Sequence, residues 1–252
     1  MRIYRFILIA LSILLAVLAC NLPDQPAGGT TTASPSDSSP DMRTATTTFP
    51  SLNRTPLPTI DIVTALPPNS NLVPFVIDPS ASSVTYEIDQ INLAQGNAVS
   101  VAAGSTSQVS GAILIDFKDP RNTQITTITV DISRFTSDSA QRDQAIRENW
   151  LQSLTYPLAI FVSKEIKGLP SSDPDQEQLN FTVSGDLSLH GRTLPITFDV
   201  SAKVQDEFLN GIAIGSLALV DFGIDPPLVP GKWQAGNLVT IRFIFEAKAE
   251  KG

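Results

Sequence analysis

The side chains most often used in catalysis and metal binding are scarce in this sequence. It contains one His, His190, and one Cys, Cys20, among 252 residues. This supply excludes an intrachain disulfide, a His/Cys zinc cluster and a Cys–His nucleophile pair. Acid–base catalysis at His190 would need a second, oriented partner within hydrogen-bond reach, and no carboxylates stand at a recognisable spacing. We therefore expect a protein that is not an enzyme, with no catalytic residue, no metal and no cofactor.

The single Cys stands at the end of a segment that is typical of an export signal. Two Arg precede fourteen apolar or small residues at positions 6–19, fewer than the about 20 that a transmembrane helix needs. The letters LAVLAC at 15–20 resemble a bacterial lipobox, whose Cys is acylated and becomes the new N-terminus. We predict a lipoprotein signal peptide over 1–19 and lipidation of Cys20. The alternative is a plain signal peptide with an incidental Cys.

A change in composition separates the next segment from the rest of the chain. Residues 21–72 hold nine Pro, ten Thr and six Ser among 52 positions. Such a segment cannot bury enough apolar surface to offset the entropy cost of ordering. We expect a disordered tether over 20–72 that joins the anchor to a folded domain over 73–252. An exported chain of this organisation would sit in the cell envelope, held by the lipid at the extracytoplasmic face of a membrane.

The charge balance argues against a nucleic-acid partner. Seventeen Lys and Arg stand against 25 Asp and Glu, a net charge of −8. Binding to nucleic acid needs clustered positive charge that displaces counterions from phosphates. The hydrophobic content of 42% is sufficient for a folded core.

From residue 73 onward, apolar side chains recur at every second position, which is typical of half-buried strands. The alternation is clear over 181–189, 194–202 and 239–248. A Gly-containing turn at 190–192 joins the first two as a hairpin. Further strands are expected at about 73–78, 83–89, 97–103, 108–117, 124–134, 157–167 and 208–222.

One connection is predicted to be helical. A capping box at 138–141 precedes Ile146, Trp150 and Leu154, which recur at helical spacing, and Pro157 ends the segment. The predicted fold is therefore all-β, an antiparallel lipocalin-like β-barrel of about eight strands with one short helix in a connection. A two-sheet sandwich is the main alternative, because the strand pattern alone does not separate the two.

Five short motifs, in order, resemble the YceI-like family over residues 73–249. They are DISRFT at 131–136 with RD at 142–143, YPLAIF at 156–161, VSGDLSLHG at 183–191, the following Pro195, and DFGI at 221–224. The resemblance implies an exported lipocalin-style barrel whose interior binds a long isoprenoid lipid. It also implies that an isoprenoid or quinone-like lipid is the bound molecule.

Candidate ligand contacts are apolar side chains on the faces expected to point inward. They are Phe181, Val183, Leu187, Ile196, Phe198, Ile241, Phe243 and Phe245, with Trp150 at one mouth of the barrel. Small inward residues, among them Gly185, Gly211, Ala213 and Gly215, would leave space beside the rings. Arg142 and Asp143, at the start of the helix, are the candidates for the head-group end. The same apolar residues could equally form a closed core.

The sequence therefore favours a membrane-anchored, extracytoplasmic protein that sequesters or carries an isoprenoid-type apolar lipid. The alternative from another class is a ligand-free β-domain that acts as a stalked adhesion or assembly module. A cavity of several hundred Å³ would support the first function, and a packed interior would support the second. A lipid-modifying enzyme is the third possibility, and single substitutions of Arg142, Asp143 and His190 would test it.

Overall fold

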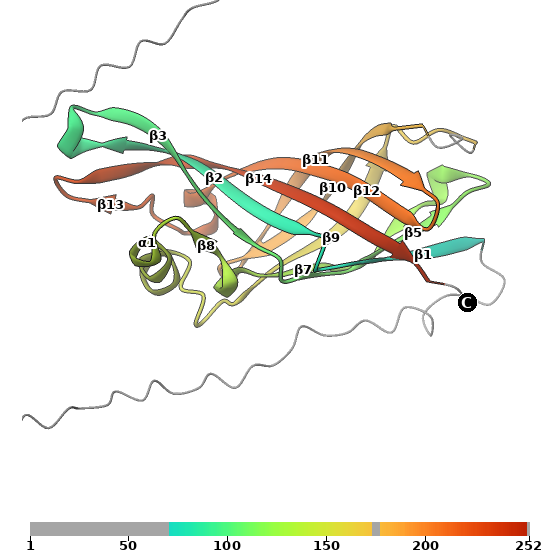
Figure 1. Cartoon of the computed structure of the whole chain (residues 1–252), viewed down its shortest axis with the longest axis horizontal. Helices are drawn as coiled ribbons and strands as arrows, with labels where there is room; N and C mark the ends of the chain where they lie inside the picture. The colour runs from blue at the N-terminus through green and yellow to red at the C-terminus, as the bar shows by residue number, and fades with distance from the viewer. Residues whose placement is uncertain (1–70, 173–176, 251–252) are drawn as a thin grey trace, which may run out of the picture. The chain divides into compact units, whose positions relative to one another are not determined.

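The computed structural model describes residues 71–172 and 177–250. Cys20, the signal peptide over 1–19 and nearly all of the tether over 20–72 lie outside this part of the chain. The described residues form one antiparallel sheet with short helical connections (Figure 1). Its longer strands are β1 (Leu72–Ile77), β2 (Ser83–Asn92), β3 (Ala98–Thr106), β5 (Ala112–Asp116), β9 (Leu158–Lys167), β10 (Leu179–Leu189), β11 (Arg192–Gln205), β12 (Phe208–Ala218) and β14 (Trp233–Ala249).

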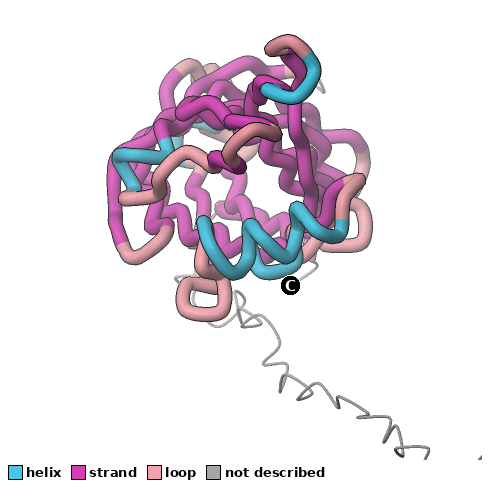
Figure 2. The backbone as a smooth tube through the Cα atoms, turned by 90° about the vertical axis from the view of Figure 1, so that its left-hand side faces the viewer, coloured by secondary structure: helices cyan, strands magenta, loops and turns pink. Residues whose placement is uncertain are grey.

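The sheet closes on itself through a bent segment of chain. The short β4 (Val109–Ser110) and β5 are separated by Gly111 alone; β4 pairs with β7 (Ile128–Asp131), whereas β5 pairs with β1. From β7 the pairing continues through β9, β10, β11, β12 and β14, which pairs with β1. Viewed from one end, the strands surround a common axis (Figure 2). The predicted antiparallel barrel is therefore confirmed, and the two-sheet sandwich is not the fold.

Beyond this ring, the sheet continues at one end of the barrel. Strand β14 pairs with β1 near its C-terminal end and with β2 over the rest of its length, and β3 pairs with β2 and with β8 (Thr136–Ser137). The remaining short strands are β6 (Gln124–Ile125), paired with β5, and β13 (Leu228–Val229), paired with β14. The β2–β3 hairpin and β13 lie at the left of Figure 1, at the same end as the helix.

The helical connection is shorter than predicted. Helix α1 spans Ala140–Ala145 and continues as a π-helical turn, Ile146–Trp150. Its N-cap is Ser139, whose hydroxyl accepts a hydrogen bond from the Arg142 amide at 3.3 Å. Leu154 lies beyond the helix and its side chain is 69% exposed, so it does not extend the apolar face.

Three predicted strands are interrupted where the chain must bend. The segment 108–117 divides at Gly111, whose φ of 150° lies outside the range that side chains favour. The segment 124–134 becomes β6, β7 and a 3-10 turn at Ile132–Arg134. Strand β12 ends at Ala218 and is followed by a 3-10 turn, Leu219–Phe222. The hairpin turn at His190 and Gly191 is as predicted, with positive φ at both residues, as type I′ requires.

The backbone at Gly185 leaves no room for a side chain, so we predict that Gly185→Ala lowers the free energy of unfolding by about 1–3 kcal/mol. The register between β9 and β10 shifts here, and a Cβ on Gly185 would collide with the Val162 carbonyl oxygen, which is backbone and cannot rotate away. Urea unfolding followed by circular dichroism measures the loss.

Gly236→Ala is the matched control, because the atom nearest to its added Cβ, the Asp89 carbonyl oxygen, is 3.4 Å away. We expect its unfolding free energy to lie within about 0.5 kcal/mol of the unmodified protein. Equal losses in the two variants would contradict the assignment of the close contact to Gly185.

Candidate functional site

The interior of the barrel contains a cavity of about 510 Å³. Its wall consists of inward side chains from most strands of the ring, together with residues of the helical segment such as Ile146, Trp150 and Leu151. Nearly all of these side chains are aliphatic or aromatic, so the wall offers dispersion contacts and almost no hydrogen bonds. Such a cavity is suited to an apolar molecule.

Eight of the nine apolar residues that the sequence proposed as ligand contacts line this cavity. They are Trp150, Phe181, Val183, Leu187, Phe198, Ile241, Phe243 and Phe245. The ninth, Ile196, does not line it: its side chain is 7% exposed and belongs to the packed core, at the position paired with Gly185. Trp150 packs edge-on against Trp233, with ring centroids 5.6 Å apart. That these residues contact a ligand stays a prediction.

Glycines in the wall leave room for the aromatic rings that lie against them. Phe198 stands opposite Gly215 across β11 and β12, and a Cβ on that glycine would lie 2.8 Å from the phenyl ring. Phe245 stands opposite Gly211 in the same way, and Phe161 covers Gly185. The sequence suggested that the inward glycines leave empty space. Instead, each of these three glycines accommodates a ring.

Sequence reasoning missed Tyr86, which lines the cavity near its helical end. Tyr86 lines the cavity together with its neighbours in the alternating pattern of β2, Val84 and Ile88. Its ring lies over Gly104, the paired residue on β3, and meets Phe135 edge-on at 5.1 Å. Burial raises the pKa of the Tyr86 phenol to about 12, with smaller effects from Arg142, which lowers it, and from Asp143 and Asp138, which raise it. The alternation over 83–89 was the signal that could have identified it.

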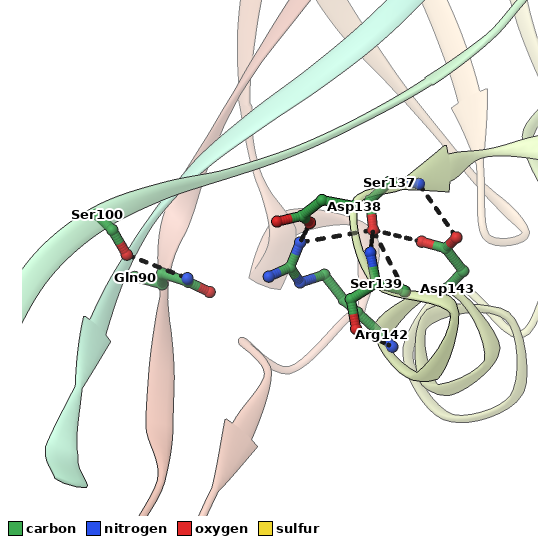
Figure 3. A network of polar contacts seen from close by, with 7 residues as sticks. All are labelled: Gln90, Ser100, Ser137, Asp138, Ser139, Arg142 and Asp143. Carbon is green, nitrogen blue, oxygen red and sulfur yellow. Dashed lines mark hydrogen bonds and ion pairs between the residues drawn. The ribbon is translucent and has the colours of Figure 1, made fainter. Parts of the chain in front are cut away.

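Arg142 and Asp143, the candidates for the head-group end, do not line the cavity. Figure 3 shows both in a polar network at the start of α1. Asp143 accepts hydrogen bonds from the Ser137 hydroxyl at 2.6 Å and the Ser137 amide at 3.1 Å, and Arg142 forms an ion pair with Asp138. The network fixes α1 to β8, and a Gln90–Ser100 hydrogen bond of 3.1 Å joins the neighbouring strands β2 and β3. A role of Arg142 and Asp143 toward a lipid head group stays a prediction.

The opposite end of the cavity carries three polar residues. Thr123, Glu177 and Asp206 line it there, from the connections that lead from β5 to β6, from β9 to β10 and from β11 to β12. Glu177 and Asp206 are exposed at this mouth. Two carboxylates beside one opening disfavour an anionic ligand at that end.

His190 lies in the turn between β10 and β11 and does not line the cavity. Its Nδ1 lies 3.2 Å from the Phe222 carbonyl oxygen, and its ring packs against Tyr156 with the ring centroids 4.9 Å apart. Within residues 71–172 and 177–250, no group of three or more His, Cys, Asp or Glu could hold a metal ion. Over the same residues, no helix has the length and apolarity needed to cross a membrane.

Comparison with known proteins places this architecture in one family. Residues 75–247 match the family described as the YceI-like domain. The YceI protein of Escherichia coli O157:H7 is 27% identical over 145 residues, which cover 55% of this chain and 71% of that protein. A UPF0312 protein of Photorhabdus laumondii is 25% identical over 150 residues, covering 57% and 73% of the two chains.

Two solved structures share the fold. Burkholderia cenocepacia BcnA superposes with a TM-score of 0.53 at 17% identity, covering 68% of this chain and 99% of that one. A polyisoprenoid binding domain from Saccharophagus degradans gives a TM-score of 0.50 at 13% identity, with 70% and 98% covered.

The raised pKa of Tyr86 predicts a loss of stability at alkaline pH. The unfolded state releases the phenol proton near pH 10 and the folded state near pH 12. Between these values the unfolded chain binds fewer protons than the folded one, so the unfolding free energy contributed by Tyr86 falls as the pH rises. Urea unfolding at pH 9 to 12 should show a steeper fall for the unmodified protein than for Tyr86→Phe. Parallel curves would contradict the buried state of the phenol.

Proposed function

The chain belongs to the family of proteins with a YceI-like domain, and from this premise we propose that its barrel binds an isoprenoid-type apolar lipid. We further propose that the protein is exported, and that it sequesters or carries this lipid at the extracytoplasmic face of a membrane to which Cys20 anchors it.

The cavity is the observation that carries the proposal. Ligand pockets typically enclose roughly 300–1,000 Å³, and the 510 Å³ inside this barrel falls in that range. A ligand-free adhesion or assembly module would have no use for this space, because interior voids cost dispersion contacts and destabilise the fold. The structural neighbour from Saccharophagus degradans, described as a polyisoprenoid binding domain, supports an isoprenoid as the occupant.

Energetics favour exchange with a membrane over irreversible capture. Burial of each CH₂ from water gains about 0.8 kcal/mol, but a membrane lipid begins in a hydrocarbon environment. Transfer from a bilayer to an apolar cavity is therefore close to neutral, and shape and polar contacts decide the preference. A near-neutral transfer is the balance that a carrier needs. Binding of this kind requires no catalytic residue, and the scarcity of His and Cys in the chain is consistent with it.

Filling the cavity should abolish lipid binding without unfolding the protein. Ala213 lines the wall on β12, and Ala213→Phe would place a ring in the lumen. We expect at least a tenfold loss of affinity for squalene, a C30 isoprenoid hydrocarbon, measured as the lipid that co-elutes with the protein after gel filtration.

Ile244→Phe is the control. Ile244 is 47% exposed on the outward face of β14, so this substitution adds the same ring outside the barrel. This variant should bind squalene as the unmodified protein does. Lipid binding that survives Ala213→Phe, in a folded variant, would contradict the cavity as the site.

Lipidation of Cys20 predicts the loss of acyl labelling and of signal cleavage when the thiol is removed. In cells fed an alkyne fatty acid, the unmodified chain should become labelled and remain in the membrane fraction. Cys20→Ser should lose the label and escape cleavage by a lipoprotein-specific peptidase. Asn21→Ser keeps the thiol and should behave as the unmodified chain. An unlabelled wild-type chain that stays in the membrane at full length would indicate an uncleaved signal anchor instead.

A further inference from the structure

The sheet extends beyond the barrel at its helical end and forms a four-stranded tip there. We define the tip as residues 90–103, where β2 turns into β3, and residues 226–240, where β13 turns into β14. The strands pair in the order β13, β14, β2, β3. The Leu93 amide donates a hydrogen bond of 2.8 Å to the Lys232 carbonyl oxygen and joins the two turns. The tip lies at the left of Figure 1.

The outward face of the tip is apolar and exposed to solvent. Leu228 pairs with Gln234, Gln234 with Ile91, and Ile91 with Val99, so these four side chains form one row across the four strands. In this row only Gln234 is polar, and Val99 is 72% exposed. The same face also carries Val101, which is 61% exposed, and Leu238, which is 62% exposed.

Charged side chains, which usually protect an exposed sheet from unwanted contacts, are nearly absent from the tip. Lys232 is the only charged residue among 90–103 and 226–240, in a chain of which 17% is charged. Asp89 and Asp225 come immediately before the two segments. Among the described residues, β3 pairs with β8 only at Gly104 and Ser105, so the outer edge of β3 before Gly104 has no strand partner. Such an uncharged apolar surface is typical of an interaction site.

The breadth of the apolar face favours a bilayer over a second copy of the chain. A second copy that added a strand to the edge of β3 would leave Leu228 and Leu238 exposed, because they lie on β13 and β14. A bilayer can cover the whole face at once. Water and lipid head groups at its surface can also pair with the free backbone groups of the β3 edge, and Lys232 suits the lipid phosphates.

The two ends of the barrel differ in a way that selects the tip as the membrane-facing end. Trp233, the first residue of β14, packs on Trp150, which lines the cavity, so the tip adjoins the helical end of the cavity. The opposite mouth carries the exposed carboxylates of Glu177 and Asp206. An anionic lipid surface would repel these carboxylates.

The length of chain before the barrel permits this orientation. Strand β1 pairs with the C-terminal end of β14, so the preceding residues join the barrel far from the tip. The 17 residues of β14 span about 58 Å at about 3.4 Å per residue. Residues 21–70 can span up to roughly 170 Å when fully extended. A chain held to a membrane at Cys20 can therefore bring its tip to the same membrane.

We propose that the outward face of the tip docks on a lipid bilayer, with Val99, Val101 and Leu238 inserted at the boundary between head groups and acyl chains. The insertion is shallow, because the unpaired edge of β3 cannot enter hydrocarbon. Docking turns the helical end of the cavity toward the membrane. This inference rests on the proposed function for the presence of a membrane, and it adds the surface by which the barrel meets that membrane.

The test measures the depth of labelled positions in the full chain, reconstituted into phosphatidylcholine liposomes. Val99→Cys carries an NBD fluorophore, and lipids with a nitroxide on the acyl chain quench it. Val162→Cys is the matched control, since Val162 is 46% exposed on β9, outside the tip. We expect about threefold stronger quenching at position 99, because an apolar face docks about 5–10 Å deep. The unmodified chain, labelled in parallel, gives the background from Cys20.

A second comparison introduces charge into the tip. With the fluorophore on Leu238→Cys, the added pair Val99→Asp and Val101→Asp should reduce quenching to the level of position 162, because charged side chains resist insertion. Val162→Asp should leave the quenching at position 238 unchanged. Both sets of substitutions replace exposed side chains, and circular dichroism checks that each variant is folded.

Equal quenching at positions 99 and 162, or none at either, would overturn docking through the tip. Self-quenching that rises with protein density, without quenching by the acyl-chain nitroxide, would overturn the bilayer as occupant and indicate a second copy of the chain. Neither result bears on the cavity, because no cavity ligand is measured here. The proposed lipid binding fails separately, if the unmodified chain does not retain squalene in gel filtration.

Discussion

The interior of this protein depends on aromatic rings that lie against glycines of the neighbouring strand. Phe245 over Gly211 and Tyr86 over Gly104 are opposed pairs, and the Phe198 ring lies against Gly215. In each case the missing Cβ makes room for the ring. With a larger residue at the glycine, the ring would have to turn toward the barrel axis. The pairs thus bury large aromatic surfaces in the wall and leave the centre open, which a small barrel filled by ordinary side chains would not do.

The same arrangement explains why polar groups are confined to the ends. Dispersion contacts with the wall are equally favourable for every segment of an apolar chain. They therefore stabilise a bound lipid without fixing its orientation. Orientation must come from sparse polar groups, and among the described residues that line the cavity these include Thr123, Glu177 and Asp206 at the end opposite the helix. The network of Ser137, Asp138, Arg142 and Asp143 is satisfied internally and serves to hold α1 against β8.

Much of the fold could be predicted because its signals are local. Period-two alternation of apolar side chains identified the long strands to within a few residues. The His190–Gly191 turn identified the hairpin of β10 and β11. The strand pattern alone did not separate a closed barrel from a two-sheet sandwich, since closure depends on the pairing of residues far apart and on one bend at Gly111. For the site, alternation identified seven of the residues that line the cavity, and helical spacing identified Trp150. Alternation does not distinguish a side chain at the cavity surface from one packed behind it, as Ile196 is. Arg142 and Asp143 do not line the cavity, because their partners are four to six residues away and satisfy them locally. Tyr86 could have been identified from the alternation over 83–89, but the degree of its burial emerges only from the structure.

The central claim is that the barrel holds a prenyl lipid, and native mass spectrometry of the protein purified without detergent from its source organism tests it most directly. Organic extraction of the same sample identifies any mass that is bound. We expect one equivalent of an isoprenoid compound. A protein that emerges empty, and that stays empty after incubation with prenyl lipids, would contradict the account and identify the domain as a ligand-free module.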